Sequence, residues 1–466
     1  MVNLISTGSN YIFVIMCVIY AISCFSVFLP SSEERQIRRM DRQEFFMFFF
    51  HFVCYVVLFC QTLDVTVIFL YVAQAAFFKV LIFIYQHLYP DCSRIMMNHT
   101  CFLLLIGFVM LTRLSMNYAV KQFLIAGVSS LIVLVVPAFV EKAYWLKKLR
   151  WVYGLLGLAF LSTVFVVGTT LNGSTNWINI GGIAFQPSEF VKISYVFFIA
   201  AMLGRRPDFK RMFLTAAFCA CHVMVLILEK DLGGALLYFG VFVFMSYVAT
   251  GRLVYLFGGL GMGALAGRIA FMLFSHVKVR FRAWADPWSD ITGNGYQITQ
   301  SLFAIGTGSW FGLGLTQGRP GDIPVVESDF IFSAITEEFG VLFSICLILI
   351  YLGVFVHFLK IAMDVTDRFY KLLGFGFSIS FILQVFLTIG GVTKFIPSTG
   401  VTLPLISYGG SSVASTLIIF AIMQGIFMIA YVDEDGTEID EDEESTGEEV
   451  TGGSDEFQAP IYTDRR

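Results

Sequence analysis

Residues 276–288 read HVKVRFRAWADPW, and residues 325–330 read VVESDF at the point where the chain turns apolar again. The segment that they bound is the only long polar stretch lying between two apolar runs. Those runs, 253–275 and 329–359, each reach the length of about 20 mainly apolar residues that a transmembrane helix needs. The segment therefore predicts a large loop between two membrane spans, and it holds most of the groups able to do chemistry.

The composition extends this pattern to the whole chain. Of its 466 residues, 57% are hydrophobic and 14% are charged, and the mean hydropathy is +0.78. Soluble globular domains carry about 25% charged residues, so lipid must solvate most of this protein. The sequence predicts an all-α polytopic membrane protein with thirteen spans. We expect these spans at residues 10–30, 44–64, 66–88, 101–116, 120–141, 150–171, 186–203, 211–229, 232–249, 253–275, 329–359, 370–395 and 404–431.

Lysine and arginine predict the orientation of the spans, because cytoplasmic loops are enriched in them. The chain has four basic loops, at 31–43, 141–150, 204–211 and 357–371. Alternation of thirteen spans places all four on one side, which is then the cytoplasmic side. The polar segment falls on the outer side together with the loops 171–182, 229–234 and 394–404. We therefore expect the amino terminus outside and the carboxyl terminus in the cytoplasm.

The net charge of −4 averages two different regions. Residues 433–466 carry fourteen acidic residues and two arginines, a balance of −12, which leaves twenty acidic and twenty-eight basic residues elsewhere, a balance of +8. The tail has almost no hydrophobic residues, which predicts a disordered cytoplasmic tail, with a docking segment for a cytoplasmic partner as the alternative. The totals give no argument for a nucleic-acid partner, and the six histidines show no zinc-ligand spacing.

Asp329 opens the apolar run that follows the polar segment. A carboxylate at the mouth of an apolar groove has a raised pKa, which suits a general base near neutral pH. Aspartate is also a preferred helix N-cap, so position alone leaves these two roles equally open. Glu337 and Glu338 lie two turns deeper in the same run, where we expect them to pair with a basic group inside the bundle.

Arg280 and Arg282 alternate with apolar residues beside Trp284 and Trp288. The planar guanidinium group binds phosphate through two hydrogen bonds, which predicts a phosphate site here. Tryptophans at a membrane interface anchor a segment at the level of the lipid headgroups. The alternative is an amphipathic element that rests on anionic lipid.

Three further places put charged or irregular sequence at the end of a span, where such groups are functional candidates by default. Glu189 and Lys192 are spaced i,i+3 and can pair with each other, which is the stronger interpretation of this motif. Asp231 stands where a span starts and can cap it. Lys394 and the run 399–412 interrupt a span with proline and glycine, so this backbone must line a cavity or be covered by protein, with close helix packing as the alternative.

The chain resembles the SEDS family (shape, elongation, division and sporulation), the group of FtsW, RodA and SpoVE. The matching motifs occur in the family order across residues 101–431 and read NWINIGGIAFQPSEFVK, EKDLGGALL, FRAWADPW, GYQITQSLFAIGTGSWFGLGLTQG, SDFIFSAITEEFG and TGVTLPLISYGGSS. The resemblance implies a ten-helix core, here residues 101–432, with the large loop before its eighth helix. Residues 1–100 then form an amino-terminal extension of about three spans, and residues 433–466 form the tail.

The resemblance also implies a peptidoglycan glycosyltransferase of cell division, elongation or sporulation. Such an enzyme polymerises lipid II, a disaccharide-pentapeptide on undecaprenyl pyrophosphate, at the outer face of the bacterial cytoplasmic membrane. Asp329 matches the essential acidic residue of the family's Asp-Phe-Ile-Phe motif and would take the proton from the attacking hydroxyl. Arg280, Arg282 and a divalent cation, Mg²⁺ or Mn²⁺, would neutralise the pyrophosphate leaving group. The remaining candidates for substrate binding are Trp177, Glu189, Lys192, Asp231, Gln297, Lys394 and Ser411.

Family members usually act with a single-pass class B penicillin-binding protein, so the resemblance implies this transpeptidase, lipid II and membrane lipids as partners. Two other functions stay open. A lipid II flippase would need a hydrophilic path open alternately to both sides, whereas the distinctive polar groups here cluster on the outer side. A non-catalytic scaffold for the transpeptidase would have no use for the carboxylate of Asp329.

Overall fold

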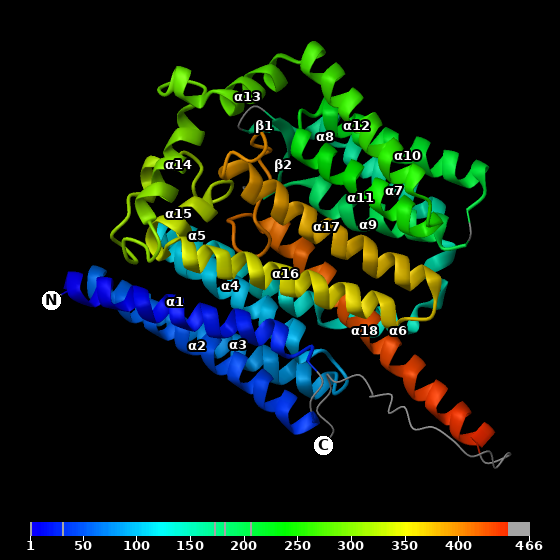
Figure 1. Ribbon diagram of the computed structural model, residues 1–466, viewed down its shortest axis with the longest axis horizontal. Coiled ribbons are helices and arrows are strands. Elements are labelled where there is room, and N and C mark those ends of the chain that lie inside the picture. The colour runs from blue at the N-terminus through cyan, green and yellow to red at the C-terminus, as the bar shows by residue number, and fades with distance from the viewer. Residues whose placement is uncertain (1, 30–31, 172–173, 181–182, 206, 446–466) are drawn as a thin grey trace.

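The computed structural model describes residues 2–29, 32–171, 174–180, 183–205 and 207–445, and Figure 1 shows an almost entirely helical bundle. Within the described residues, twelve helices are long and apolar enough to cross a membrane. The predicted span at 186–203 is a further helix, α9 (Pro187–Leu203), whose 17 residues lie at the short end of the range for a span. The expectation of an all-α polytopic membrane protein is confirmed.

The long apolar helices follow the predicted spans in chain order. Those before α9 are α1 (Val2–Ser26), α2 (Glu33–Thr62), α3 (Val65–Leu88), α4 (Arg94–Leu114), α5 (Met116–Ile132) continued by η1 (Val133–Val135) and α6 (Val136–Lys142), and, after η2 (Tyr144–Lys148), α7 (Arg150–Ser162) continued by α8 (Val164–Val167). Those after α9 are α10 (Phe209–Leu228), α11 (Leu232–Thr250), α12 (Leu253–Leu273), α16 (Val341–Asp364), α17 (Arg368–Val392) and α18 (Gly410–Ser445).

A small three-stranded antiparallel sheet is the one departure from helix among the described elements. Its strands, in the order β1-β2-β3, are β1 (Thr169–Leu171), β2 (Ser174–Ile180) and β3 (Ile183–Phe185). The register places Trp177 opposite Thr169. The sheet occupies the predicted loop before α9, so it shapes that loop without replacing a span.

The polar segment 276–329 is not one open loop. It contains four short helices: α13 (Ser275–Ala285), η3 (Pro287–Asp290), α14 (Tyr296–Gly308) and η4 (Pro320–Asp322). Figure 1 places α13 and α14 toward the same end of the bundle as the sheet. Most of the polar groups singled out in the sequence therefore gather at one end of the molecule.

The prediction of one continuous span over 329–359 is wrong. The chain forms two helices there, α15 (Ile331–Phe339) and α16 (Val341–Asp364), separated at Gly340. Gly340 has a φ of 89°, a left-handed conformation that favours glycine. A Cβ at Gly340 would lie 2.5 Å from the carbonyl oxygen of Trp310, so the break also lets the polar segment pack closely here.

The three amino-terminal helices form one bundle with the rest of the chain. α1 runs along α16, and α2 packs on both α1 and α4. Phe50 of α2 stacks on Phe343 of α16, with ring centroids 5.7 Å apart. α4 is buried from Arg94 to Leu111. Figure 1 shows α1, α2 and α3, in blue, along one side of the bundle. These three helices therefore cover a face that would otherwise meet lipid.

α18 continues beyond its apolar part into the acidic tail. Its apolar part ends near Tyr431, whereas the helical backbone reaches Ser445 and projects from the bundle in Figure 1. The sequence predicts disorder from residue 433, but extending an existing helix requires no new nucleus. The remainder of the predicted tail, 446–466, lies outside the described residues.

Candidate functional site

A cavity of about 760 Å³ lies where the sheet, the polar segment and the chain between α17 and α18 come together. Its walls come from α5, β2, α9, α11, α13, the turn before α15 and the start of α18. Seven of the predicted site residues line it: Trp177, Glu189, Lys192, Asp231, Arg280, Asp329 and Ser411. Motifs that are far apart in the sequence thus form one polar site.

Asp329 lies half-buried in the wall of the cavity, in the turn before α15. Phe330 occupies the N-cap position of α15, and no side chain caps this helix, so Asp329 does not serve as the cap. Burial raises the pKa of the Asp329 carboxyl group, while a hydrogen bond with Ser328 and the positive charge of Arg280 oppose the rise. The net direction is upward, as expected for a carboxyl group at the mouth of a groove.

The turn that carries Asp329 is hydrogen-bonded to the chain between α17 and α18. The Ser407 hydroxyl donates to the carbonyl oxygen of Ser328 at 2.5 Å. The N–H of Tyr408 donates to the carbonyl oxygen of Glu327 at 2.7 Å. These two hydrogen bonds join the turn to the irregular chain between α17 and α18, so the two segments hold a common position.

Asp329 and Arg280 both lie close to Gly400. Gly400 has a φ of 72°, and a Cβ there would lie 3.5 Å from Asp329 Oδ2 and 3.9 Å from both terminal nitrogens of Arg280. The Arg280 guanidinium group donates to the carbonyl oxygens of Ser398 and Thr399 at 3.4 and 3.1 Å. A carboxylate and a guanidinium group therefore both approach Gly400, and all three residues line the cavity.

The predicted ion pair between Glu189 and Lys192 is confirmed. Lys192 Nζ lies 2.7 Å from Glu189 Oε2 and 2.9 Å from the Gln384 side-chain oxygen of α17. The Ser415 hydroxyl of α18 donates to the same glutamate oxygen at 2.9 Å. Lys192 is 3% exposed, and buried charges of this kind require such partners. The group joins α9, α17 and α18 in the wall of the cavity.

Asp231 caps a helix and also lines the cavity. Its Oδ1 accepts a hydrogen bond from the N–H of Gly234 at 2.8 Å, as expected of the N-cap of α11. Its Oδ2 accepts from Asn176 at 3.1 Å and from Gln186 at 3.3 Å. Burial raises the pKa of Asp231, and the hydrogen bonds from Gly234 and Asn176 oppose the rise. The predicted cap is confirmed, and the same carboxylate joins β2 and α9 to α11.

The chain between α17 and α18 has no regular structure, and polar side chains satisfy its backbone. Gln384 donates to the carbonyl oxygen of Thr402 at 3.1 Å. Tyr351 donates to the carbonyl oxygen of Pro404 at 2.7 Å. The segment lines the cavity on either side of Pro404. The expectation that this interrupted backbone lines a cavity is confirmed.

Arg282, Gln297 and Lys394 do not line the cavity. Arg282 is exposed, because it lies two residues from Arg280 on a helix and such side chains point to different faces. Gln297 is exposed at the start of α14. Lys394 is half-buried with a φ of 59°, and its carbonyl oxygen accepts a hydrogen bond from the Trp284 indole at 3.1 Å.

Sequence reasoning missed several charged residues at the site. Lys121, Lys230 and Glu327 line the cavity. Lys121 stands within an apolar run, and a charge inside a span is the signal that could have identified it.

Glu229 is 1% exposed, and neither of its carboxyl oxygens has a hydrogen-bond partner in the part of the chain that the structure describes. Burial, followed by the negative charge of Asp231, raises the pKa of Glu229 to about 8.

The cavity offers oxygen ligands for a hard cation, but few of them. Asp231, Glu327 and Asp329 supply carboxylates to its lining. Among the described residues, no group of three or more His, Cys, Asp or Glu side chains is placed to hold a metal ion. Mg²⁺ is commonly bound by one or two carboxylates together with the phosphates of a substrate. These residues therefore fit a cation that arrives with a phosphate-bearing ligand.

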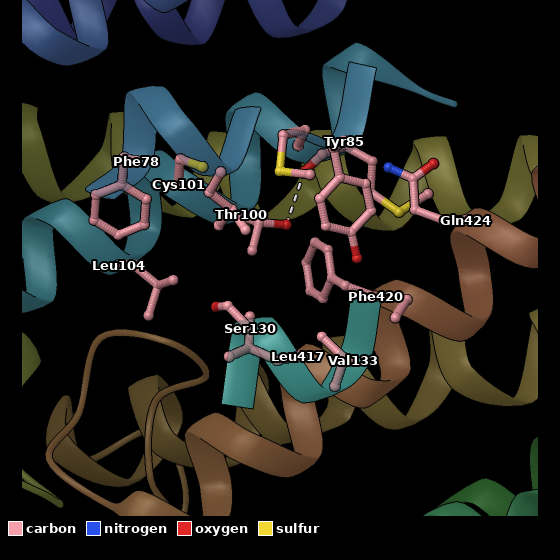
Figure 2. A pocket seen from close by; sticks show the side chains of 14 residues that line it. Phe78, Tyr85, Thr100, Cys101, Leu104, Ser130, Val133, Leu417, Phe420 and Gln424 are labelled. Carbon is pink, nitrogen blue, oxygen red and sulfur yellow. Dashed lines mark hydrogen bonds between the residues drawn. The ribbon is translucent and has the colours of Figure 1, made fainter. Parts of the chain in front are cut away.

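A second, much smaller cavity lies between α3, α4, α5 and α18. Its volume is about 30 Å³, and Figure 2 shows Phe78, Leu104 and Phe420 around it. The Thr100 hydroxyl in its wall donates to the carbonyl oxygen of Met96 in the same helix at 2.8 Å. None of the predicted site residues lines this cavity, so the candidate chemistry belongs to the larger one.

Comparison with known proteins identifies the family. The model of the FtsW, RodA and SpoVE cell cycle proteins matches residues 93–431. The chain is 36% identical over 310 residues to the peptidoglycan glycosyltransferase RodA of Mycobacterium tuberculosis, a match that covers 62% of this chain and 66% of that protein, just under two thirds of its length. It is 33% identical over 320 residues to the stage V sporulation protein E of Bacillus subtilis, which covers 66% of this chain and 86% of that protein.

Solved structures share the fold. A chain from a peptidoglycan synthase complex, studied for its structural coordination of polymerization and crosslinking, matches with a TM-score of 0.63 and 25% identity over 72% of this chain and 97% of that one. The rod shape determining protein RodA of Thermus thermophilus matches with a TM-score of 0.56 and 24% identity over 72% and 96%, a likeness of fold. The protein belongs to the family of FtsW, RodA and SpoVE.

Proposed function

We propose that this protein is a peptidoglycan glycosyltransferase that polymerises lipid II into glycan strands. The observation that carries the proposal is that Asp329 and Arg280 both lie close to Gly400 in the lining of one large cavity. The relative from Mycobacterium tuberculosis is named a peptidoglycan glycosyltransferase, and it supports the same activity for the shared region.

The cavity suits a substrate with a polar head and a long apolar tail. Leu124 and Ile125 of α5 and Phe190 of α9 line its apolar side. Leu124 is 60% exposed, which leaves room for an apolar tail beside α5. An undecaprenyl chain can remain in the membrane while its pyrophosphate and sugars reach Asp329 and Arg280.

Asp329 accepts the proton of the sugar hydroxyl that attacks the anomeric carbon of the growing strand. A bond forms between that hydroxyl oxygen and the anomeric carbon, while the bond from this carbon to the pyrophosphate oxygen breaks. The upward pKa shift of Asp329 brings the group closer to the working pH, which favours general base catalysis. One displacement inverts the configuration and requires no covalent enzyme intermediate.

Arg280 neutralises the departing pyrophosphate, because a guanidinium group binds phosphate oxygens in pairs. Lys121 and Lys230 line the same cavity and add positive charge. Arg282 is exposed on α13, and we propose that it contacts lipid phosphates. A carboxylate among Asp231, Glu327 and Asp329 would hold Mg²⁺ or Mn²⁺, which would supply further positive charge for the pyrophosphate.

We place the reaction at the outer face of the bacterial cytoplasmic membrane, with the amino terminus outside and the carboxyl terminus in the cytoplasm. The bias of lysine and arginine toward the opposite set of loops supports this orientation. A class B penicillin-binding protein is the proposed partner, in cell division, elongation or sporulation. The structural relative from a complex that coordinates polymerization and crosslinking supports this pairing.

The test combines the full-length protein with a candidate class B transpeptidase, labelled lipid II and Mg²⁺ or Mn²⁺, and separates the products on a gel. We expect glycan ladders from the wild-type chain and none from Asp329→Ala, with both equally folded and complexed. Glycan ladders from both proteins would support the glycosyltransferase activity and would show that Asp329 is not its general base. No ladder from an intact wild-type complex would contradict the proposal and favour a flippase, for which transfer of lipid II across liposomes is the assay.

A further inference from the structure

The amino-terminal helices precede the matched family region, which begins at residue 93, yet α1 contacts the polar segment. Asn10 Nδ2 donates to the carbonyl oxygen of Gly312 at 3.1 Å. The ring of Tyr11 meets that of Phe311, with centroids 5.2 Å apart. α1 therefore holds two consecutive residues of the polar segment through one hydrogen bond and one ring contact.

This part of the polar segment is built onto the end of α15. The N–H groups of Leu313 and Gly314 donate to the carbonyl oxygens of Glu337 and Glu338, both at 3.0 Å. Gly312 has a φ of 80°, and a Cβ there would lie 2.2 Å from the Glu338 carbonyl oxygen. The backbones of the segment and the helix touch, so a displacement of one displaces the other.

Two side chains on α15 strengthen this junction. Arg113 of α4 donates to Glu338 Oε1 at 3.0 Å and to the carbonyl oxygen of Gly318 at 3.2 Å. The N–H of Arg319 donates to Glu337 Oε1 at 3.0 Å. The prediction that these glutamates pair with a basic group inside the bundle is confirmed for Glu338.

α15 carries this junction at one end and the turn with Asp329 at the other. The helix has nine residues, all buried, and spans about 13 Å at 1.5 Å per residue. Phe339, its last residue, packs edge-on against Phe13 of α1 with centroids 5.2 Å apart, and Phe50 of α2 lies 6.1 Å away. A short helix buried in close packing moves as a unit, so these contacts bear on the position of Asp329.

We propose that the amino-terminal extension is a positioning element for the glycosyl-transfer site, with Asn10 and Tyr11 as its contact residues. α1 holds the polar segment in position. The polar segment, together with the contact between Phe13 and Phe339, holds α15, and α15 holds the turn with Asp329. This inference rests on the proposed function, in which Asp329 must meet the attacking hydroxyl. Such geometry matters, because a displacement of about 1 Å can cost about a hundredfold in rate.

The test compares three single substitutions in the full-length protein within its transpeptidase complex. Asn10→Leu removes the hydrogen bond to Gly312, and Tyr11→Ala removes the ring contact at a residue that is 52% exposed. Tyr20→Phe is the matched control on the same helix. It removes the hydrogen bond of the buried Tyr20 hydroxyl to His99, 3.1 Å long, and His99 belongs to α4 and not to the polar segment.

We expect Asn10→Leu and Tyr11→Ala each to lower kcat for lipid II polymerisation about tenfold, with KM within about twofold of wild type. Tyr20→Phe keeps the wild-type kcat. Amide hydrogen exchange is the second readout, and it should become faster over residues 311–319 and α15 in the two variants alone. An equal loss in Tyr20→Phe, or a loss explained by less folded protein with unchanged kcat per folded molecule, would overturn the inference.

Wild type and Asp329→Ala, measured alongside, separate this inference from the function on which it rests. If the wild type makes no glycan, the proposed function fails and the positioning role with it. If the wild type is active and Asp329→Ala is not, while Asn10→Leu and Tyr11→Ala both retain full kcat, the positioning role alone is overturned.

Discussion

The large and the small cavity differ in their side chains and in the backbone around them. The large cavity is walled partly by turns and irregular chain, and three lysines, an arginine and several carboxylates line it. The small cavity lies among regular helices, and leucine, phenylalanine, valine and methionine dominate its wall (Figure 2). Charged side chains are costly inside a membrane bundle. Their concentration around one cavity supports the proposal that it is the functional site.

Asp329→Asn should give the largest difference in activity between a change in the large cavity and a change in the small one. The amide cannot accept the proton of the attacking hydroxyl, so we expect kcat to fall by about 10²–10⁴-fold. Thr100→Val is the matched change in the small cavity, and it should leave kcat unchanged, because the Thr100 hydroxyl bonds within its own helix. Initial rates of glycan formation by equal amounts of folded protein measure both. Similar losses in the two variants would contradict the comparison.

Lys192→Met tests whether the charges around the large cavity also stabilise it. The substitution leaves the Glu189 carboxylate without its ion partner, which should lower the free energy of unfolding by about 3–5 kcal/mol. Glu189→Gln combined with Lys192→Met removes both charges and should recover part of this loss. Thermal unfolding in detergent compares the variants. If the double variant loses as much free energy of unfolding as Lys192→Met and Glu189→Gln lose together as single variants, the coupling between the two charges is refuted.

Arg280→Met probes the electrostatics over Gly400. The Arg280 charge holds the pKa of Asp329 below the value that burial alone would give. Without that charge the pKa of Asp329 rises further. Because a general base works only when it is deprotonated, the acidic limb of the pH–activity profile should shift to higher pH. We also expect the plateau of kcat/KM to fall about tenfold to a hundredfold through lost phosphate binding.

The pH profile of kcat/KM measures this effect, and Arg282→Met is its control. Arg282 lies on the exposed face of α13, so its loss should leave the acidic limb of the profile in place. An acidic limb that stays unshifted in Arg280→Met would contradict the assignment of Asp329 as the titrating base.

Ser130→Ala in the small cavity should have the smallest effect. The Ser130 hydroxyl is buried without a hydrogen-bond partner among the described residues. Its removal should raise the free energy of unfolding by about 1 kcal/mol or less and leave polymerisation unchanged. Thermal unfolding and the glycan assay check the two parts. A marked loss of polymerisation would mean that the small cavity takes part in function.

Features fixed by local geometry could be predicted from the sequence. The i,i+3 spacing of Glu189 and Lys192 and the position of Asp231 before a span each specify one interaction, and both are present. The sequence predicted one phosphate site for Arg280 and Arg282, but the segment is helical and only Arg280 lines the cavity. Spacing identifies a shared site only when the local secondary structure is known.

Features fixed by packing between distant segments could not be predicted. Asn10 and Gly312 are separated by 302 positions, and no local pattern relates them. Lys121 joins the cavity only because α5 packs beside the start of α18. Gly340 interrupts an apolar run that is long enough for one span, and its left-handed φ occurs where the polar segment packs against it.

Gly400 has a consequence for inhibition and resistance. A small molecule that rests on this glycine touches the carboxylate of Asp329 and the guanidinium group of Arg280 together. Any other residue at position 400 would have to adopt a φ of 72°, which costs roughly 1–2 kcal/mol for a residue with a side chain. Escape from such a compound would therefore require backbone strain at position 400 or loss of a group that the proposed reaction uses.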